Sequence, residues 1–325
     1  MQPHDIFRNL SPLDHRYWLA NRELFDRLAD VLSEEAAVGQ CVRVESILLV
    51  HLIRHLTPEG PDRDAWIAAA EALPERVTAA EVYEEEETTR HNIRAIVNVI
   101  QRHLPEEIRH LVHLGATSVD ILDTAAALRY RAAVRTVVLP VLMQVEELLI
   151  HLADTTADTV SIGRTHGQHA VPITMGWTFA EYVSRLGQSI VEIEARSRGL
   201  HGKLAGAVGA YNATSVLHPD PERLEREVLA DLDLEPGEHA TQIVSPEPLL
   251  RLLLEMNTAF GVLANLADDL RHLQRSEIAE LAEYFAAGQV GSSTMPHKRN
   301  PWNAEHVKSL WKTFAPRSMT WFMDQ

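Results

Sequence analysis

The chain has 325 residues, too many for one small domain, and 46% of them are hydrophobic, which is enough for a sizeable core. Its formal net charge of -16 excludes nucleic acid as an expected partner, because binding a phosphate backbone needs a dense basic surface. The single cysteine, Cys41, excludes an internal disulfide and a thiolate metal cluster. These features predict a folded protein of a reducing compartment.

Neither a targeting signal nor a membrane partner is expected. The first residues, Met1 to Asp5, lack the charged and apolar regions of a signal peptide. No apolar run approaches the ~20 residues that a membrane span requires. The expected location is therefore the cytoplasm.

Helical periodicity dominates the sequence. Apolar residues recur at spacings of three and four over residues 134–152, 179–193 and 260–273, the last continuing a run that begins near Pro248. No region shows a sustained period of two, so a sheet of any size is not expected. We predict an all-α fold with a helical N-terminal domain over 1–114 and a central long-helix bundle over 115–325.

Glycine, proline and polar residues mark the breaks between helices. The predicted loops cover residues 57–64, 115–120, 161–172, 218–221, 235–248 and 288–301. The acidic run Glu84 to Glu87 is predicted to form the solvated first turn of the helix that carries His91.

The densest polar loop is Gly291 to Pro301, with the sequence GSSTMPHKRNP. It combines neighbouring hydroxyls with an imidazole and two cations. Such a loop could close over an anionic substrate and bring a hydroxyl to the reacting atoms. The alternative is an ordinary polar connector.

A second polar segment, Gly163 to Ala170, contains His166 and His169. Histidine titrates near neutral pH, so an imidazolium could donate a proton to a leaving amine. Alternatively, the histidine only caps the following helix. A metal site at these two histidines is not expected, because no carboxylate or thiolate lies nearby in the sequence.

Two further segments, 88–92 and 113–120, carry polar residues between helices. Thr117 and Ser118 are predicted to lie at a helix N-terminus, where backbone N–H groups bind carboxylates, although they could equally serve only as caps. The glycine-rich stretch 199–209 lacks the Gly-Lys-Ser/Thr ending of a phosphate-binding loop.

The loop 291–301 resembles the signature of the fumarase, aspartase and argininosuccinate lyase superfamily, whose members eliminate fumarate from substituted succinates. Segments 163–170 and 271–277 are similar to those of the adenylosuccinate lyase branch. The segment 11–17 resembles the N-terminal opening of that branch, with His15 where a glycine is common. The resemblance runs from about residue 11 to the end of the chain.

This resemblance implies a lyase of purine biosynthesis that cleaves adenylosuccinate to AMP and fumarate by β-elimination. It also implies cleavage of the related succinylated carboxamide ribotide, SAICAR. Neither a cofactor nor a metal is implied. A homotetramer whose active sites several copies share is expected. The alternatives are a sister lyase acting on another succinyl-amine such as argininosuccinate, or a non-catalytic helical relative.

The resemblance also assigns residues to roles. It makes Ser292 the base that removes the Cβ proton and His166 the acid, with His91 and Glu305 supporting the acid and Lys298 holding the developing charge. The implied substrate-binding residues are Arg16, Tyr17, Arg90, His113, Thr117, Ser118, Thr165, Gln242, Ser293, Met295 and Asn300. After Gln242, the sequence Ser-Pro-Glu-Pro departs from the Arg-Asp pair of many relatives. Relatives also continue well beyond Lys298, so a C-terminal domain is expected to be absent from this chain.

Overall fold

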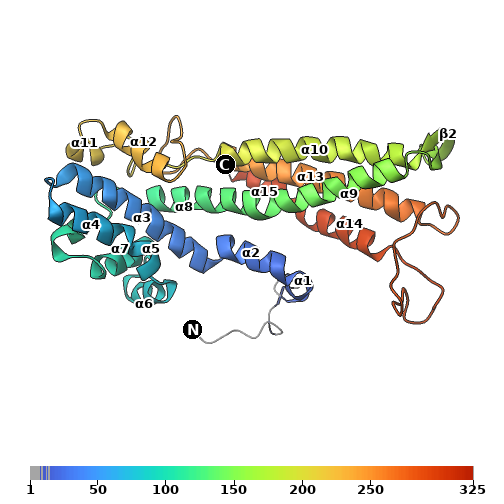
Figure 1. Ribbon diagram of the computed structural model, residues 1–325, viewed down its shortest axis with the longest axis horizontal. Helices are drawn as coiled ribbons and strands as arrows, with labels where there is room; N and C mark the ends of the chain where they lie inside the picture. The colour runs from blue at the N-terminus through green and yellow to red at the C-terminus, as the bar shows by residue number, and fades with distance from the viewer. Residues whose placement is uncertain (1–7, 9, 12, 14, 325) are drawn as a thin grey trace. The chain divides into compact units, whose positions relative to one another are not determined.

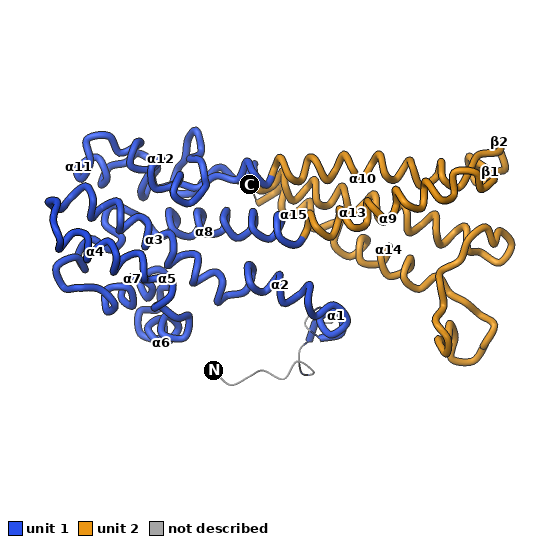
Figure 2. Tube along the Cα trace, in the orientation of Figure 1, with its two compact units in different colours: residues 1–137, 197–248 blue, residues 138–196, 249–325 orange. Residues whose placement is uncertain are grey.

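The computed structural model describes residues 8, 10, 11, 13 and 15–324 (Figure 1). Met1 to Asp5, together with Pro12 and Asp14 of the N-terminal motif, lie outside the described residues. The chain forms two compact units (Figure 2). Unit 1 comprises residues 1–137 and 197–248, and unit 2 comprises 138–196 and 249–325.

This division differs from the predicted boundary near Gly115. Residues 115–137 and 197–248 belong with the N-terminal helices, because the helix that begins at Ser118 packs on the helix Glu34–Leu56. Sequence periodicity identifies the long helices but carries no information about which of them pack together.

Unit 1 is built from helices of 4 to 23 residues. They are α1 (Arg16–Ala20), α2 (Arg22–Leu32), α3 (Glu34–Leu56), α4 (Pro61–Glu71), α5 (Leu73–Arg76), α6 (Ala79–Thr89), α7 (Asn92–Arg102), the 3₁₀ helix η3 (Glu106–Leu111), α8 (Ser118–Ala133), α11 (Thr214–Leu217) and α12 (Pro221–Asp231).

Helix α3 forms the centre of unit 1. The Ser33 side chain caps its N-terminus by accepting a hydrogen bond from the N–H of Ala36. Glu34 in the first turn and Arg54 in the last turn have the charges that the helix dipole favours. Most residues of its C-terminal half are buried. The contacts of α3 include α4, α8 and α12.

Unit 2 is built mainly from long helices. They are α9 (Leu139–Thr155), α10 (Met175–Arg198), α13 (Glu247–Leu273), α14 (Trp302–Phe314) and α15 (Arg317–Met323). A π-helical turn, η4 (Val134–Val138), joins α8 to α9. The three predicted apolar stretches fall in η4 with α9, in α10 and in α13, so the predicted all-α class is confirmed.

The predicted loop 161–172 is instead an antiparallel hairpin of β1 (Val160–Thr165) and β2 (Gln168–Thr174). The register shifts between Ile162 and Arg164, which indicates a bulge. The irregular register and the largely exposed strands explain why the sequence shows no period of two.

The prediction for the acidic run Glu84 to Glu87 was wrong. These residues lie in the second half of α6, not in the first turn of the helix near His91. Helix α6 ends at Thr89 because Arg90 adopts a left-handed conformation with φ 52°. His91 then caps the separate helix α7, and its Nδ1 accepts from the N–H of Arg94 at 3.3 Å.

The expectation that no segment reaches the length of a membrane span was also wrong. Three helical stretches are long and apolar enough by length and composition, namely Arg22–Leu56, Ser118–Thr155 and Glu247–Leu273. The most apolar window of the first is 67% buried, against 22% and 28% for the other two. Met143 and Leu148 on α9 are 51% and 56% exposed, so α9 presents apolar side chains at its surface.

Candidate active site

The loop between α13 and α14 holds the predicted base. The hydroxyl oxygen of Ser292 accepts hydrogen bonds from the backbone N–H groups of Thr294 at 3.4 Å and Met295 at 3.3 Å. Hydrogen-bond donors beside an oxygen favour its charged form. Ser292 is half-buried and Ser293 is exposed, and no described hydrogen bond reaches the Ser293 hydroxyl. The two serines therefore differ in their surroundings, and of the pair only the Ser292 hydroxyl accepts hydrogen bonds from the described backbone.

Close backbone contacts fix the two ends of this loop. The side-chain amide of Asn300 donates to the carbonyl oxygen of Gly291 at 3.0 Å. A Cβ at position 291 would lie 2.2 Å from the carbonyl oxygen of Lys298, so only glycine fits there. Glu283 accepts from the N–H of Ala304 at 2.9 Å, which anchors the start of α14. Asn300, predicted as a substrate ligand, thus also closes the loop.

Other predicted residues of this region lie at its surface. The side chains of Met295 and Lys298 are exposed, and the N–H of Lys298 donates to the Met295 carbonyl at 3.1 Å. Glu305 lies in the first turn of α14 and is half-buried. An exposed ammonium on a glycine-containing loop is free to approach an anionic ligand.

The predicted acid lies at the tip of the β1–β2 hairpin. His166 and Gly167 both have positive φ, 54° and 74°, and His166 is exposed. It therefore belongs to a hairpin turn and does not cap a helix. Glu280 anchors strand β1, since it accepts from the Ser161 hydroxyl at 2.8 Å and pairs with Arg164.

Within the described part of unit 2, no hydrogen bond or ion pair joins the hairpin tip 165–168 to the loop 291–300. A shallow groove of about 470 Å³ lies between α9 and α10 and is lined mainly by small and apolar residues such as Ala153 and Trp177. It includes neither predicted catalytic residue. The predicted acid and the predicted base thus lie on separate segments, the hairpin tip and the loop between α13 and α14.

Thr165 is the exposed last residue of β1, and the other predicted residues lie in unit 1. Arg16 and Tyr17 begin the short helix α1. Arg90 and His91 form the exposed junction between α6 and α7. Gln242 is exposed in the loop before α13, and the nearby N–H of Val244 donates to Asp123 of α8 at 2.9 Å.

His113 contacts a carboxylate that the sequence analysis did not single out. Its Nδ1 lies 2.6 Å from Oε1 of Glu45, which is fully buried on α3. Burial lowers the pKa of His113, but the hydrogen bond and charge of Glu45 and the charge of Asp120 outweigh it, so the pKa lies above its ordinary value. Arg94 opposes this rise only weakly.

We expect this contact to make stability depend on pH. An unfolded histidine has a pKa of about 6.5. Because the folded pKa of His113 is higher, its contribution to stability is fully present below the unfolded value and is lost as the pH rises through the folded value. NMR titration should place the His113 midpoint above that of the Glu45→Gln variant. A midpoint that does not move in a folded Glu45→Gln protein would contradict the assignment.

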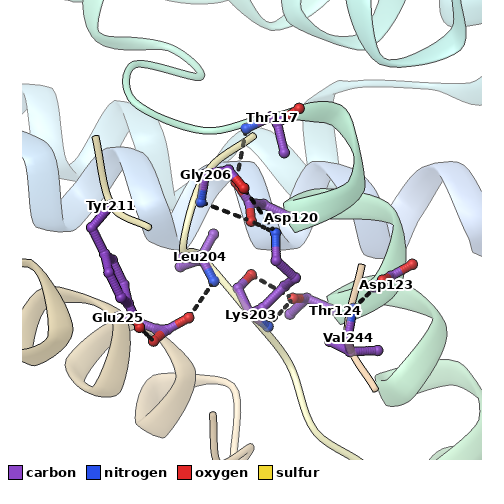
Figure 3. A network of polar contacts seen from close by, with 10 residues as sticks. All are labelled: Thr117, Asp120, Asp123, Thr124, Lys203, Leu204, Gly206, Tyr211, Glu225 and Val244. Carbon is purple, nitrogen blue, oxygen red and sulfur yellow. Dashed lines mark hydrogen bonds and ion pairs between the residues drawn. The ribbon is translucent and has the colours of Figure 1, made fainter. Parts of the chain in front are cut away.

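The helix N-terminus at Thr117 and Ser118 is fixed by a buried ion pair (Figure 3). Lys203 and Asp120 are paired with side chains 1% and 0% exposed. Asp120 also accepts from the N–H of Thr117 at 2.8 Å, closing the first turn of α8. Lys203 donates to the carbonyl of Gly206 at 3.3 Å. The pair therefore joins the start of α8 to the glycine-rich stretch.

A second carboxylate fixes the same stretch from α12. Glu225 accepts from the N–H of Leu204 at 2.6 Å and from the hydroxyl of Tyr211 (Figure 3). Burial raises the pKa of Glu225, and these two donors act against that rise. Side chains of α8 and α12 thus hold the backbone of the glycine-rich stretch.

Sequence reasoning missed Glu45, Lys203 and Glu280 as supporting residues. Glu45 had one usable signal, since it is a charged residue in the apolar run of α3. The signal for Lys203 was weaker, since it is the lysine of a glycine-rich stretch. No sequence signal pointed to Glu280, because its partners in β1 lie more than a hundred residues earlier in the chain.

Comparisons with known proteins agree with this fold. The chain is 36% identical over 305 residues to an adenylosuccinate lyase of Pyrococcus horikoshii, and 34% identical over 300 residues to one of Archaeoglobus fulgidus. Each alignment covers 92% of this chain but 64% of the relative, so the chain spans less than two thirds of the length of these relatives.

Solved structures show the same architecture. The 3-carboxy-cis,cis-muconate lactonizing enzyme of Pseudomonas putida matches with a TM-score of 0.78 and 25% identity, over 96% of this chain and 68% of that one. A fumarate lyase of Mesorhizobium sp. BNC1 matches with a TM-score of 0.74 and 22% identity, over 90% of this chain and 64% of that one. A family model described as Lyase matches residues 47–312. The chain therefore belongs to the lyase family.

Proposed function

We propose that this chain carries the β-elimination chemistry that releases fumarate from adenylosuccinate and leaves AMP. The likeness to adenylosuccinate lyases supports the substrate. The observation that carries the chemistry is the half-buried Ser292 hydroxyl with two backbone N–H donors. The related succinylated ribotide SAICAR offers the same succinyl-amine group and is the second proposed substrate.

Ser292, as its alkoxide, removes the proton from Cβ of the succinyl group. The electron pair moves toward the adjacent carboxylate and forms a doubly charged aci-carboxylate. A positive charge beside this intermediate stabilises it, and we assign this role to Lys298, which would approach with its loop. The anchored loop ends at Gly291 and Asn300 would limit the reorganisation that this step requires.

His166, as imidazolium, protonates the departing nitrogen as the C–N bond breaks. The electron pair of the aci-carboxylate returns to form the double bond of fumarate. His166 is exposed at the hairpin tip, so its imidazole is accessible to a substrate. His91, with Glu305 as the proposed orienting carboxylate, supports the acid.

Binding of the two succinyl carboxylates is assigned to the start of α8. Ser118 offers a backbone N–H at the helix N-terminus, where partial positive charge favours anions, and Thr117, whose own N–H is held by Asp120, offers its hydroxyl. Arg16, Tyr17 and His113 are proposed to bind the nucleotide. The proposed reaction consists of proton transfers and bond cleavage, so it requires no cofactor.

We further propose that the active chain is a homotetramer with shared sites, in the cytoplasm. The exposed apolar residues of α9 and α10, such as Leu148 and Val191, support association because water contact with such faces is unfavourable. The buried, unpaired Cys41 supports a reducing compartment. Analytical ultracentrifugation at several concentrations would measure the association.

An ultraviolet assay of the purified chain tests the substrate. Adenylosuccinate should be cleaved to AMP and fumarate, while argininosuccinate should be left intact, with the products identified by mass spectrometry. The His166→Ala variant is expected to lose about 10²- to 10⁴-fold in turnover, the usual contribution of a general acid. Cleavage of argininosuccinate alone would replace the proposed function by that of a sister lyase. Absence of turnover on both substrates would favour a non-catalytic relative.

A further inference from the structure

Two helices of unit 1 bring together histidines and carboxylates to which the proposed function assigns no role. His51 and His55 stand one turn apart on α3, and Glu227 and Asp231 stand one turn apart on α12. The Nε2 atom of His51 lies 2.9 Å from Oδ2 of Asp231. The Nε2 atom of His55 lies 3.6 Å from Oε2 of Glu227. Each helix therefore contributes two potential ligands to the same face.

Three of these side chains converge within the reach of one ion. One ligand atom from each of His51, His55 and Glu227 lies within 4.8 Å of the other two. On a tetrahedral zinc, ligand atoms about 2.0–2.2 Å from the metal lie about 3.3 Å from one another. The His55 to Glu227 separation of 3.6 Å is long for a hydrogen bond but close to that value.

The side chains of this cluster are buried to different extents, which leaves the site accessible to an ion from solvent. The side chain of His51 is 8% exposed and fixed between the helices. Those of His55 and Glu227 are 31% and 33% exposed, so they can adjust by rotation and an ion can enter from solvent.

Outer contacts already orient the ligands. Arg223 donates from Nε to Oε1 of Glu227 at 2.7 Å, which leaves Oε2 directed at His55. The rings of His55 and His218 meet edge to face with centroids 4.4 Å apart, which restrains the His55 ring. Partners of this kind fix ligand orientation in metal sites.

We infer that His51, His55 and Glu227 form a site for a divalent transition metal, with zinc as the best fit, that joins α3 to α12. Two imidazoles and one carboxylate are a ligand set that zinc accepts, with a fourth position open to water. A hard cation such as Mg²⁺ prefers oxygen ligands and should bind poorly. The rival explanation is that two histidine–carboxylate contacts simply hold the helices together.

Isothermal titration of the untagged, chelator-treated chain with ZnCl₂ distinguishes these explanations. We expect one zinc per chain to bind at this site, and the melting temperature to rise as zinc is added, because a ligand of the folded state stabilises it. MgCl₂ should produce neither effect. Absence of zinc binding would overturn the inference.

Variants assign the binding to the cluster. His55→Ala and Glu227→Gln change partly exposed side chains, so the fold should be kept, as circular dichroism would verify. Each should weaken zinc binding by more than about tenfold, the smallest loss usual for even an outer partner. His110→Ala, at an exposed histidine of η3, is the matched control and should bind as the unsubstituted chain does. Unchanged zinc affinity in both folded cluster variants would contradict the site.

Discussion

Replacing Ser292 by alanine is expected to lower kcat for adenylosuccinate cleavage by about 10³-fold, within the range that a positioned general base contributes. The variant keeps the loop, because Gly291 and Asn300 still fix its ends. It removes the oxygen that accepts the N–H groups of Thr294 and Met295. Steady-state ultraviolet kinetics would measure the loss.

The neighbouring serine provides the comparison for this prediction. Ser293 is assigned to substrate binding, so Ser293→Ala should mainly raise KM and leave kcat much less affected than Ser292→Ala does. The reverse pattern would move the base to Ser293. Equal kcat in Ser292→Ala and the unsubstituted chain would remove Ser292 from the chemistry altogether.

The second large effect is expected at the buried ion pair of Lys203 and Asp120. Lys203→Met leaves the Asp120 carboxylate without its charged partner in a fully buried position. Loss of one member of a buried pair costs about 3–5 kcal/mol, because the remaining charge is neither paired nor hydrated. Denaturant unfolding monitored by circular dichroism should show this decrease in the free energy of unfolding.

A surface ion pair offers the matched control. Arg22 and Asp26 are 71% and 54% exposed and one turn apart on α2. Arg22→Met should therefore cost only about 0.3–0.5 kcal/mol. The double variant Asp120→Asn/Lys203→Met should be less destabilised than the sum of the single variants, since both changes remove the same interaction. A Lys203→Met protein as stable as Arg22→Met would contradict the structural role of the pair.

The sequence predicts the helical class and the long helices because their apolar stripes repeat over many turns. It predicts the N-terminus of α8 correctly because Thr117 and Asp120 have the spacing of a cap. It fails where the structure depends on short or distant contacts. The hairpin tip carrying His166 is one such place, since its irregular, exposed strands lack an alternating pattern.

The candidate site likewise contains residues that the sequence indicates and residues that it does not indicate. Dense polar motifs indicate Ser292 and His166 at once, because hydroxyls, imidazoles and cations gather in short segments. The residues that hold the site backbone are scattered single carboxylates and one lysine. Glu45 contacts His113, which is 68 residues away in the sequence, and Lys203 contacts Asp120, which is 83 residues away. A local sequence pattern cannot predict contacts at such separations.

Deuterium exchange tests most directly whether Ser292 acts as the base and His166 as the acid. In D₂O, the His166→Ala variant should still remove the Cβ proton but fail to expel the amine. The recovered adenylosuccinate should therefore gain one deuterium, as measured by mass spectrometry. In the double variant Ser292→Ala/His166→Ala this incorporation should stop. Incorporation at the same rate in both variants would contradict the assignment of Ser292 as the base.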